Sequence, residues 1–139
     1  MATPLAAGDE ILAGRVFRRI QNFKSRFNEK IQRPKISAFR PDPADQGELS
    51  VHLEDLVSQE TVLAVMAAHP LLHFFGLCAL DVAVVRAVMA GRSRVIYKPD
   101  TTDPQLGHAH VVLTNLDDDE LQAVLLRHAH VLVEPQHLQ

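Results

Sequence analysis

The sequence predicts an α+β fold, a small single domain in which a sheet of about four to five short strands packs with about three to four helices. A chain of 139 residues has the length of one domain. Apolar residues make up 47% of the chain and charged residues 22%, which is typical of a folded globular protein. Segments with alternating apolar residues are mixed along the chain with segments of helical spacing, and this mixture favours the α+β class.

The first predicted element lies near the N-terminus and can be interpreted in two ways. Apolar residues recur with the spacing of one helical face at Val16, Ile20, Phe23, Phe27 and Ile31. With Asp9 as a possible N-cap and Pro34 as a stop, this spacing predicts a helix from about residue 10 to 32. The alternative is a strand over Arg15–Ile20 followed by a loop, because Val-Phe-Arg-Arg-Ile is also acceptable strand sequence and Gly14 weakens a helix.

A strand follows after a turn-rich connection. Residues Lys35 to Arg40 are extended in character, and the proline-, aspartate- and glycine-rich stretch over 41–47 predicts a linker. Apolar and polar residues then alternate from Glu48 to Leu53, which indicates a half-buried strand. This alternation places His52 on the outward side of the strand.

Two helices and a buried strand are expected in the middle of the chain. Ser58 can cap a helix that runs through Ala68 and ends before a proline. The apolar stretch Gly76 to Leu80 suits a buried strand. A further helix is bracketed by Asp81 as N-cap and Gly91 as C-cap.

The C-terminal third predicts three strands and one helix. Arg94 to Lys98 is predicted to form a strand, and residues 100–107 are predicted to form a loop. His108 to Thr114 is the next strand. Asp117 to Glu120 matches an Asp-x-x-Glu capping box that opens a helix, and His130 to Val133 is the last strand.

Charge divides the single domain into a flexible N-terminus over 1–8, a basic amphipathic segment over 9–40 and an acidic α+β core over 41–139. Residues 11–40 hold nine of the fourteen Lys and Arg side chains against one acid, a net charge of +8, whereas residues 41–139 carry a net charge of −9. Such a basic segment can bind an outside polyanion or pair with the acidic remainder of its own chain. The candidate binding residues are Arg15, Arg18, Arg19, Lys24, Arg26, Lys30 and Arg33.

An acidic protein is the partner that this segment favours, because the basic residues accompany a stripe of apolar ones. Nucleic acid is the second candidate, since four phenylalanines among the charges could stack on unpaired bases: Phe17, Phe23, Phe27 and Phe39. A membrane surface is not expected, because an anionic bilayer would repel the acidic remainder. The sequence does not indicate an oligomeric state.

A cytoplasmic location is expected. The chain shows no signal-peptide pattern, and its longest apolar stretch, Val82 to Ala90, is too short to span a bilayer. A single cysteine, Cys78, cannot form an internal disulfide, which fits a reducing compartment. Its neighbours are apolar, so we expect Cys78 to be an inert core thiol.

Histidines suggest a possible transition-metal site. His-Ala-His-Val occurs twice, and in a strand over residues 108–114 the side chains of His108 and His110 would point to the same face. Two imidazoles are half of a metal site, and His52, Asp100 and Asp103 are the candidates to complete it. The second copy, beginning at His128, straddles a helix end and a strand start, so its two rings need not converge.

The sequence therefore leaves three functional hypotheses. The leading one is a small cytoplasmic, non-catalytic interaction or accessory protein that docks on an acidic partner through its basic segment. The second is a nucleic-acid-binding module that uses the same segment. The third is a metal-dependent enzyme centred on His108 and His110. No P-loop, dinucleotide fingerprint or nucleophile elbow is present, and no cofactor besides a possible transition metal is indicated.

Overall fold

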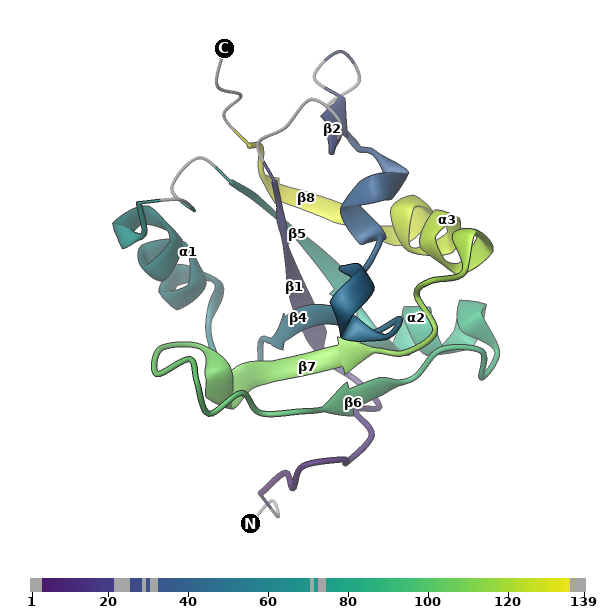
Figure 1. Cartoon of the computed structure of the whole chain (residues 1–139), viewed down its shortest axis with the longest axis horizontal. Helices are drawn as coiled ribbons and strands as arrows, with labels where there is room; N and C mark the ends of the chain where they lie inside the picture. Colours follow the sequence, from purple (N-terminus) through teal and green to yellow (C-terminus); the bar gives the residue numbers. More distant parts are fainter. Residues whose placement is uncertain are drawn as a thin grey trace.

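The structure, a computed structural model, describes residues 4–21, 26–28, 30, 33–70, 72 and 75–135. Six of its strands form an antiparallel sheet (Figure 1): β1 (Arg15–Ile20), β4 (Leu49–Leu53), β5 (Gly76–Asp81), β6 (Val95–Tyr97), β7 (His110–Leu113) and β8 (His130–Val133). Their order is β6-β7-β4-β1-β5-β8, so β1 and β4 lie at the centre. A separate two-stranded sheet pairs β2 (Phe27–Asn28) with β3 (Arg33–Pro34).

Helices complete the fold on both sides of the sheet. Within the described residues there are three α-helices, α1 (Gln59–Ala68), α2 (Val82–Met89) and α3 (Asp119–His128). Three short 3-10 helices accompany them, η1 (Ile36–Phe39), η2 (Pro43–Asp45) and η3 (Gly107–Ala109). Figure 1 shows α1 on one side of the molecule and α2 with α3 on the other. No helix in this part of the chain is long and apolar enough to cross a membrane.

The predicted α+β class is confirmed, although the sheets contain more strands than expected. The strands predicted within 48–53, 76–80, 94–98 and 130–133 and the helices predicted within 58–68, 82–90 and 117–128 are confirmed, with small shifts at their ends. The additional strands β1, β2 and β3 all come from the basic segment. The difference therefore lies in the N-terminal part, where the sequence pattern was ambiguous.

The prediction of a helix over residues 10–32 is wrong, and the strand alternative at Arg15–Ile20 is confirmed. All six residues of β1 pair with β5, from Arg15 opposite Asp81 to Ile20 opposite Gly76. Gly14 has a φ of +94°, a conformation that a right-handed helix excludes. Pairing with β5 therefore outweighs the helical spacing of the apolar residues. Two of those apolar residues, Phe23 and Ile31, lie outside the described residues.

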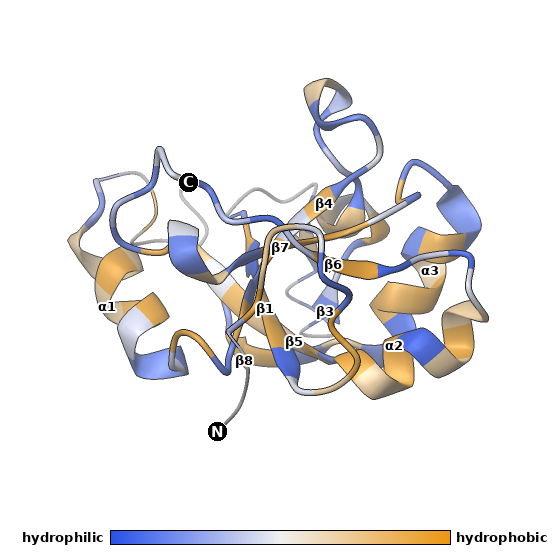
Figure 2. Cartoon of the chain, turned by 90° about the horizontal axis from the view of Figure 1, so that it is seen from below, coloured by the Kyte–Doolittle hydropathy of each residue, from blue (hydrophilic) through white to orange (hydrophobic). Residues whose placement is uncertain are grey.

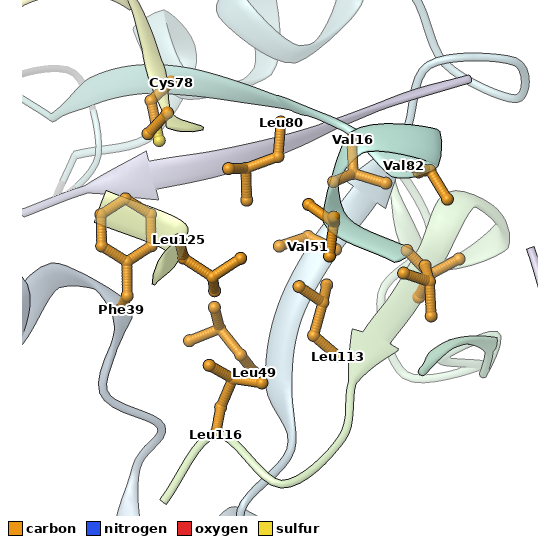
Figure 3. Close-up of a cluster of buried hydrophobic side chains, with 14 of the residues drawn as sticks. Val16, Phe39, Leu49, Val51, Cys78, Leu80, Val82, Leu113, Leu116 and Leu125 are labelled. Atoms are coloured by element: carbon orange, nitrogen blue, oxygen red, sulfur yellow. The ribbon is translucent and has the colours of Figure 1, made fainter. Parts of the chain in front are cut away.

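Both faces of the sheet are covered by apolar side chains, which explains why β1 shows no simple alternation. Its Val16 and Ile20 belong to the larger core beneath α2, α3 and η1, whereas Phe17 belongs to a smaller core beneath α1. Figure 3 shows part of the larger core, and Figure 2 shows apolar residues on the strands and helices that enclose it. All three side chains are at most 1% exposed, so β1 is a central strand with apolar side chains buried on both faces of the sheet.

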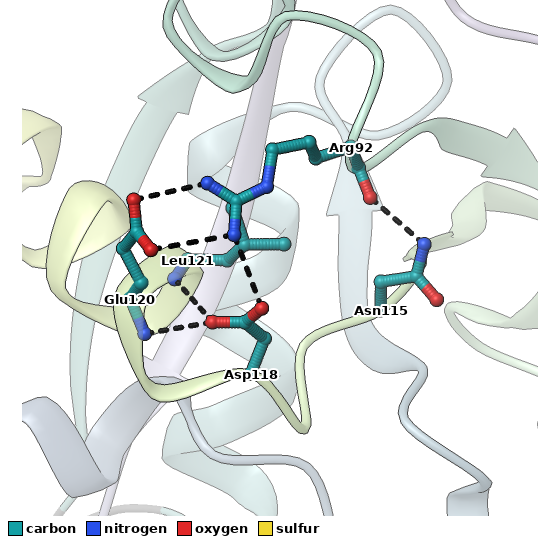
Figure 4. A network of polar contacts seen from close by, with 5 residues as sticks. All are labelled: Arg92, Asn115, Asp118, Glu120 and Leu121. Carbon is teal, nitrogen blue, oxygen red and sulfur yellow. Dashed lines mark hydrogen bonds and ion pairs between the residues drawn. The ribbon is translucent and has the colours of Figure 1, made fainter.

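The N-terminus of α3 is held by Asp118, one residue after the predicted cap Asp117. The Asp118 carboxylate accepts hydrogen bonds from the backbone N–H groups of Glu120, at 2.8 Å, and Leu121, at 3.3 Å. Arg92 bridges the carboxylates of Asp118 and Glu120 (Figure 4). The acidic run therefore satisfies free backbone donors at a helix start, as its composition suggested.

Lys35 to Arg40, predicted to be extended, instead forms η1. The Lys35 N–H donates to the Arg26 carbonyl, and the Lys35 carbonyl accepts from the Ala38 N–H at 2.9 Å. This turn brings Ala38 and Phe39 into the larger core, where they are 4% and 0% exposed. Burial of two apolar side chains outweighs the local preference for an extended chain.

Candidate anion-binding site

A pocket of about 340 Å³ lies where β1 ends beside η1. Among the described residues its lining comes from four stretches of chain, with Arg18, Arg19, Gln21, Arg26, Ser37, Ala38, Arg40, Pro41, Asp42, Pro43, Leu72 and Phe75. Four arginines and one aspartate are the charged residues among them. We call this the arginine pocket.

Arg18 is held from β1 by two backbone carbonyls. Its Nε donates to the Ala38 carbonyl at 3.2 Å and its Nη1 to the Ser50 carbonyl at 2.9 Å. These bonds connect β1 to η1 and β4. Burial lowers the pKa of Arg18 to about 10, so its positive charge is retained near neutral pH but is incompletely solvated.

Arg26 is fixed in a similar way. Its Nε donates to Oε1 of Gln21 at 2.8 Å and its Nη1 donates to the Ser37 carbonyl at 2.7 Å. A guanidinium has five N–H groups. Two bonds from each of Arg18 and Arg26 leave the Nη2 hydrogens of both without a partner in the part of the chain that the structure describes.

Arg19 and Arg40 contribute the remaining positive charges. Arg19 is half-buried and Arg40 is exposed. Burial lowers the pKa of Arg19, and the nearby Asp103 opposes this shift. In the described part of the chain, no ion pair involves any of the four arginines of the pocket.

Asp42, the one acid among the described lining residues, is engaged elsewhere. Oδ1 of Asp42 accepts the Ala44 N–H at 3.0 Å and thereby caps η2. Four guanidiniums against one carboxylate leave a net positive lining. Arginine binds carboxylate and phosphate oxygens with paired N–H donors, so this arrangement suits an anion.

The structure gathers three of the seven predicted basic residues in this pocket, Arg18, Arg19 and Arg26. Arg15 instead pairs with Glu54 and lies over the ring of Phe17. Arg33 donates to the Leu126 and Ala129 carbonyls at the end of α3, at 2.8 and 3.2 Å. These two side chains therefore stabilise the fold.

The two remaining predicted basic residues are Lys24 and Lys30, and the pocket also contains residues that the sequence did not indicate. Lys30 is exposed and does not line the pocket, and Lys24 lies outside the described residues. Sequence reasoning missed Arg40, which was counted in the charge of the segment but assigned to no surface. It also missed the apolar wall of Leu72 and Phe75, because only the folded chain brings that segment beside β1.

His108 and His110 do not share a face, which corrects the strand prediction. His108 lies in η3, outside β7, and its Nε2 donates to the Leu56 carbonyl at 3.1 Å. His110 opens β7, and its Nδ1 donates to the Lys98 carbonyl at 2.6 Å. Alternation along a strand applies only where both residues lie in the strand, and the turn of η3 removes His108 from it.

His52 lies beside His110, and the prediction that it points outward is wrong. The two residues are opposite each other on β4 and β7, with ring centroids 6.0 Å apart in an edge-to-face arrangement. His52 is 5% exposed, because the face of β4 that was expected to meet water is covered by other parts of the chain. Burial is the main cause that lowers its pKa to about 4, followed by the positive charge of Arg19.

A metal site finds no support in this geometry. Among the residues that the structure describes, no group of three or more His, Cys, Asp or Glu side chains could hold a metal ion. The second histidine doublet is also divided, because His128 ends α3 and His130 begins β8. Cys78 is fully buried, and burial raises the pKa of its thiol to about 12, which leaves it a poor nucleophile.

Comparison with known proteins identifies no relative of this chain. No protein-family model, no curated protein and no solved structure matches the chain. Any function assigned to the molecule must therefore be argued from the arginine pocket itself.

Proposed function

We propose that this chain is a small, non-catalytic interaction protein that docks on an acidic protein partner through its basic N-terminal segment. The arginine pocket is the centre of the contact, and the cytoplasm is the compartment that the single cysteine favours. The observation that carries the proposal is the set of four arginines, three of them half-buried, for which the described residues supply no carboxylate within ion-pair distance.

Uncompensated charge supports an external partner over an internal one. A half-buried cation without a counter-ion costs free energy, and an anion that enters the pocket recovers part of that cost. Backbone carbonyls already orient Arg18 and Arg26. Binding therefore immobilises few additional side-chain torsions, and the entropy cost of binding is small. The acidic core of the same chain compensates these charges only at longer range, through Asp45 on Arg18 and Asp103 on Arg19, and none of these carboxylates forms an ion pair with the pocket arginines.

Protein is favoured over nucleic acid by the positions of the phenylalanines. Phe17, Phe27 and Phe39 are at most 2% exposed, so they are not available to stack on bases. The fourth, Phe23, lies outside the described residues. The charges are also gathered in a pocket, whereas a nucleic-acid backbone is usually followed by an open groove or stripe.

A binding titration tests the proposal. Two fluorescent probes, an oligo-glutamate peptide and a single-stranded oligothymidine, are titrated with the full chain and with the double variant Arg19→Gln/Arg40→Gln. We expect the peptide to bind more tightly than the oligonucleotide and its affinity to fall about tenfold or more in the variant, as charged hydrogen bonds are lost.

The matched control is Arg94→Gln/Arg127→Gln, which removes two exposed arginines away from the arginine pocket. Its affinity for the peptide should stay within about twofold of the unmodified chain. An equal loss in both double variants would show a general charge effect and contradict the proposal. Tighter binding of the oligonucleotide would favour the nucleic-acid hypothesis instead.

A further inference from the structure

The arginine pocket also distinguishes between kinds of acidic group. We infer that it receives a phosphorylated aromatic side chain, a phosphotyrosine of the partner protein, in preference to a carboxylate. This inference rests on the proposed function, and it names the chemical group that the partner presents.

The charge of the pocket matches a dianion better than a monoanion. Four arginines against one aspartate give the described lining residues a net charge of +3. A glutamate side chain supplies a single negative charge, whereas a phosphate monoester carries about −1.5 to −2 at neutral pH. It also offers three strong acceptor oxygens, so more than one guanidinium can donate to it at once.

The donors come from several separate segments of the chain. Arg18 is anchored by the carbonyls of Ala38 and Ser50, and Arg26 by the carbonyl of Ser37, so both guanidiniums have fixed positions. Arg19 and Arg40 come from the end of β1 and the residue after η1. Donors from separate elements suit a tetrahedral group, which accepts from several directions, better than a planar carboxylate.

One wall of the pocket is apolar, and this wall indicates what carries the phosphate. Leu72 and Phe75 are half-buried and line the pocket together with Pro41 and Pro43. The cavity of about 340 Å³ is larger than a lone phosphate requires and lies in the range of about 300 to 1,000 Å³ of small-molecule sites. A tyrosine ring can pack on this wall while its phosphate reaches the arginines, whereas phosphoserine or glutamate would leave the wall uncovered.

The experiment compares four fluorescent peptides of one neutral sequence that differ at a single position, which holds phosphotyrosine, phosphoserine, glutamate or tyrosine. We expect the full chain to bind the phosphotyrosine peptide about tenfold or more tightly than the phosphoserine and glutamate peptides, and the tyrosine peptide weakest. Phenyl phosphate should displace the bound peptide from the unmodified chain, a measurement that needs no variant.

Two variants separate the contributions of charge and ring. Arg19→Gln/Arg40→Gln should weaken both phosphopeptides, whereas Phe75→Leu should lower the affinity for the phosphotyrosine peptide to that for the phosphoserine peptide and leave the latter unchanged. Arg94→Gln/Arg127→Gln serves as the control for charge and should bind like the unmodified chain. Thermal unfolding of each variant establishes that it is folded.

The outcomes distinguish this inference from the proposed function. If the glutamate peptide binds as tightly as the phosphotyrosine peptide and Arg19→Gln/Arg40→Gln weakens both, the preference for phosphate is wrong and the proposed function stands. If none of the four peptides binds, the inference is wrong, whereas the proposed function fails only if the oligo-glutamate peptide does not bind either. If adenosine 5′-monophosphate displaces the peptide at lower concentration than phenyl phosphate does, the pocket prefers a nucleotide and the inference of a protein source is overturned.

Discussion

His52 is a buried side chain whose protonation the fold resists. It lies in β4, which pairs with β1 on one side and β7 on the other. The groups that lower its pKa to about 4 are, after burial itself, Arg19, His110 and Arg18, while Asp103 opposes them. The folded-state pKa therefore lies below the ordinary value of 6.5. Protonation favours the unfolded chain, so His52 contributes full stability above pH 6.5 and loses that contribution as the pH falls toward 4.

This linkage gives a prediction for the variant His52→Gln. Between pH 7 and pH 4 the free energy of unfolding of the unmodified chain should fall by about 3 kcal/mol more than that of the variant. Urea unfolding at several pH values measures the difference, and carboxylates titrate in both proteins and cancel. Parallel stability profiles would mean that water reaches the His52 ring and that its pKa is ordinary.

Individual residues also show where sequence reasoning stops. The basic segment could be recognised from its charge, but the roles of its arginines could not. Arg26 and Arg33 both lie in the basic segment, and nothing in the sequence distinguishes them. Arg33 nevertheless donates to carbonyls at the end of α3, 93 and 96 residues away. Charge at a position says nothing about which distant carbonyl will lie beside it, so structural and pocket arginines look alike in the sequence.

At the scale of elements, predictions succeeded where the signal was local. Ser58 and Asp81 were recognised as caps because their side chains accept backbone N–H groups three residues ahead, at 3.2 and 3.1 Å. β1 could not be decided in this way, because Val16 and Ile20 have a spacing that fits both a helix face and one side of a strand. Its pairing with β5, some 60 residues later, decides the outcome, and that pairing leaves no local signal.

The cap of α3 provides an element-scale prediction with its own control. Asp118→Ala should lower the free energy of unfolding by about 1 to 2 kcal/mol, because two backbone N–H groups lose their acceptor and Arg92 loses one carboxylate. Asp117→Ala removes an equal charge one residue earlier and should cost less than about 0.5 kcal/mol. Chemical denaturation measures both. A larger loss in Asp117→Ala would identify that residue as the cap.

At the scale of the whole molecule, the fold places part of the basic segment in the central sheet of the domain. The basic segment is not a detached arm, since β1 runs through the centre of the sheet and exchanges bonds with β4 and β5. Its arginines are therefore presented by the rigid core of the fold, which favours a fixed pocket over a flexible basic tail. The same placement explains why the pocket could not be predicted, because it requires β1, η1 and the segment before β5 to meet.

A rigid pocket with uncompensated charge should make the stability of the whole fold sensitive to multivalent anions. An anion that binds the folded chain alone stabilises it by mass action, by about 1 kcal/mol at several times its Kd. At constant ionic strength, replacing chloride by inorganic phosphate should therefore raise the Tm by about 3 °C in the unmodified chain. Differential scanning fluorimetry measures the shift, and Arg19→Gln/Arg40→Gln should lose most of it. A shift of equal size in that variant would mean that phosphate acts through general exclusion from the protein surface, which requires no binding site.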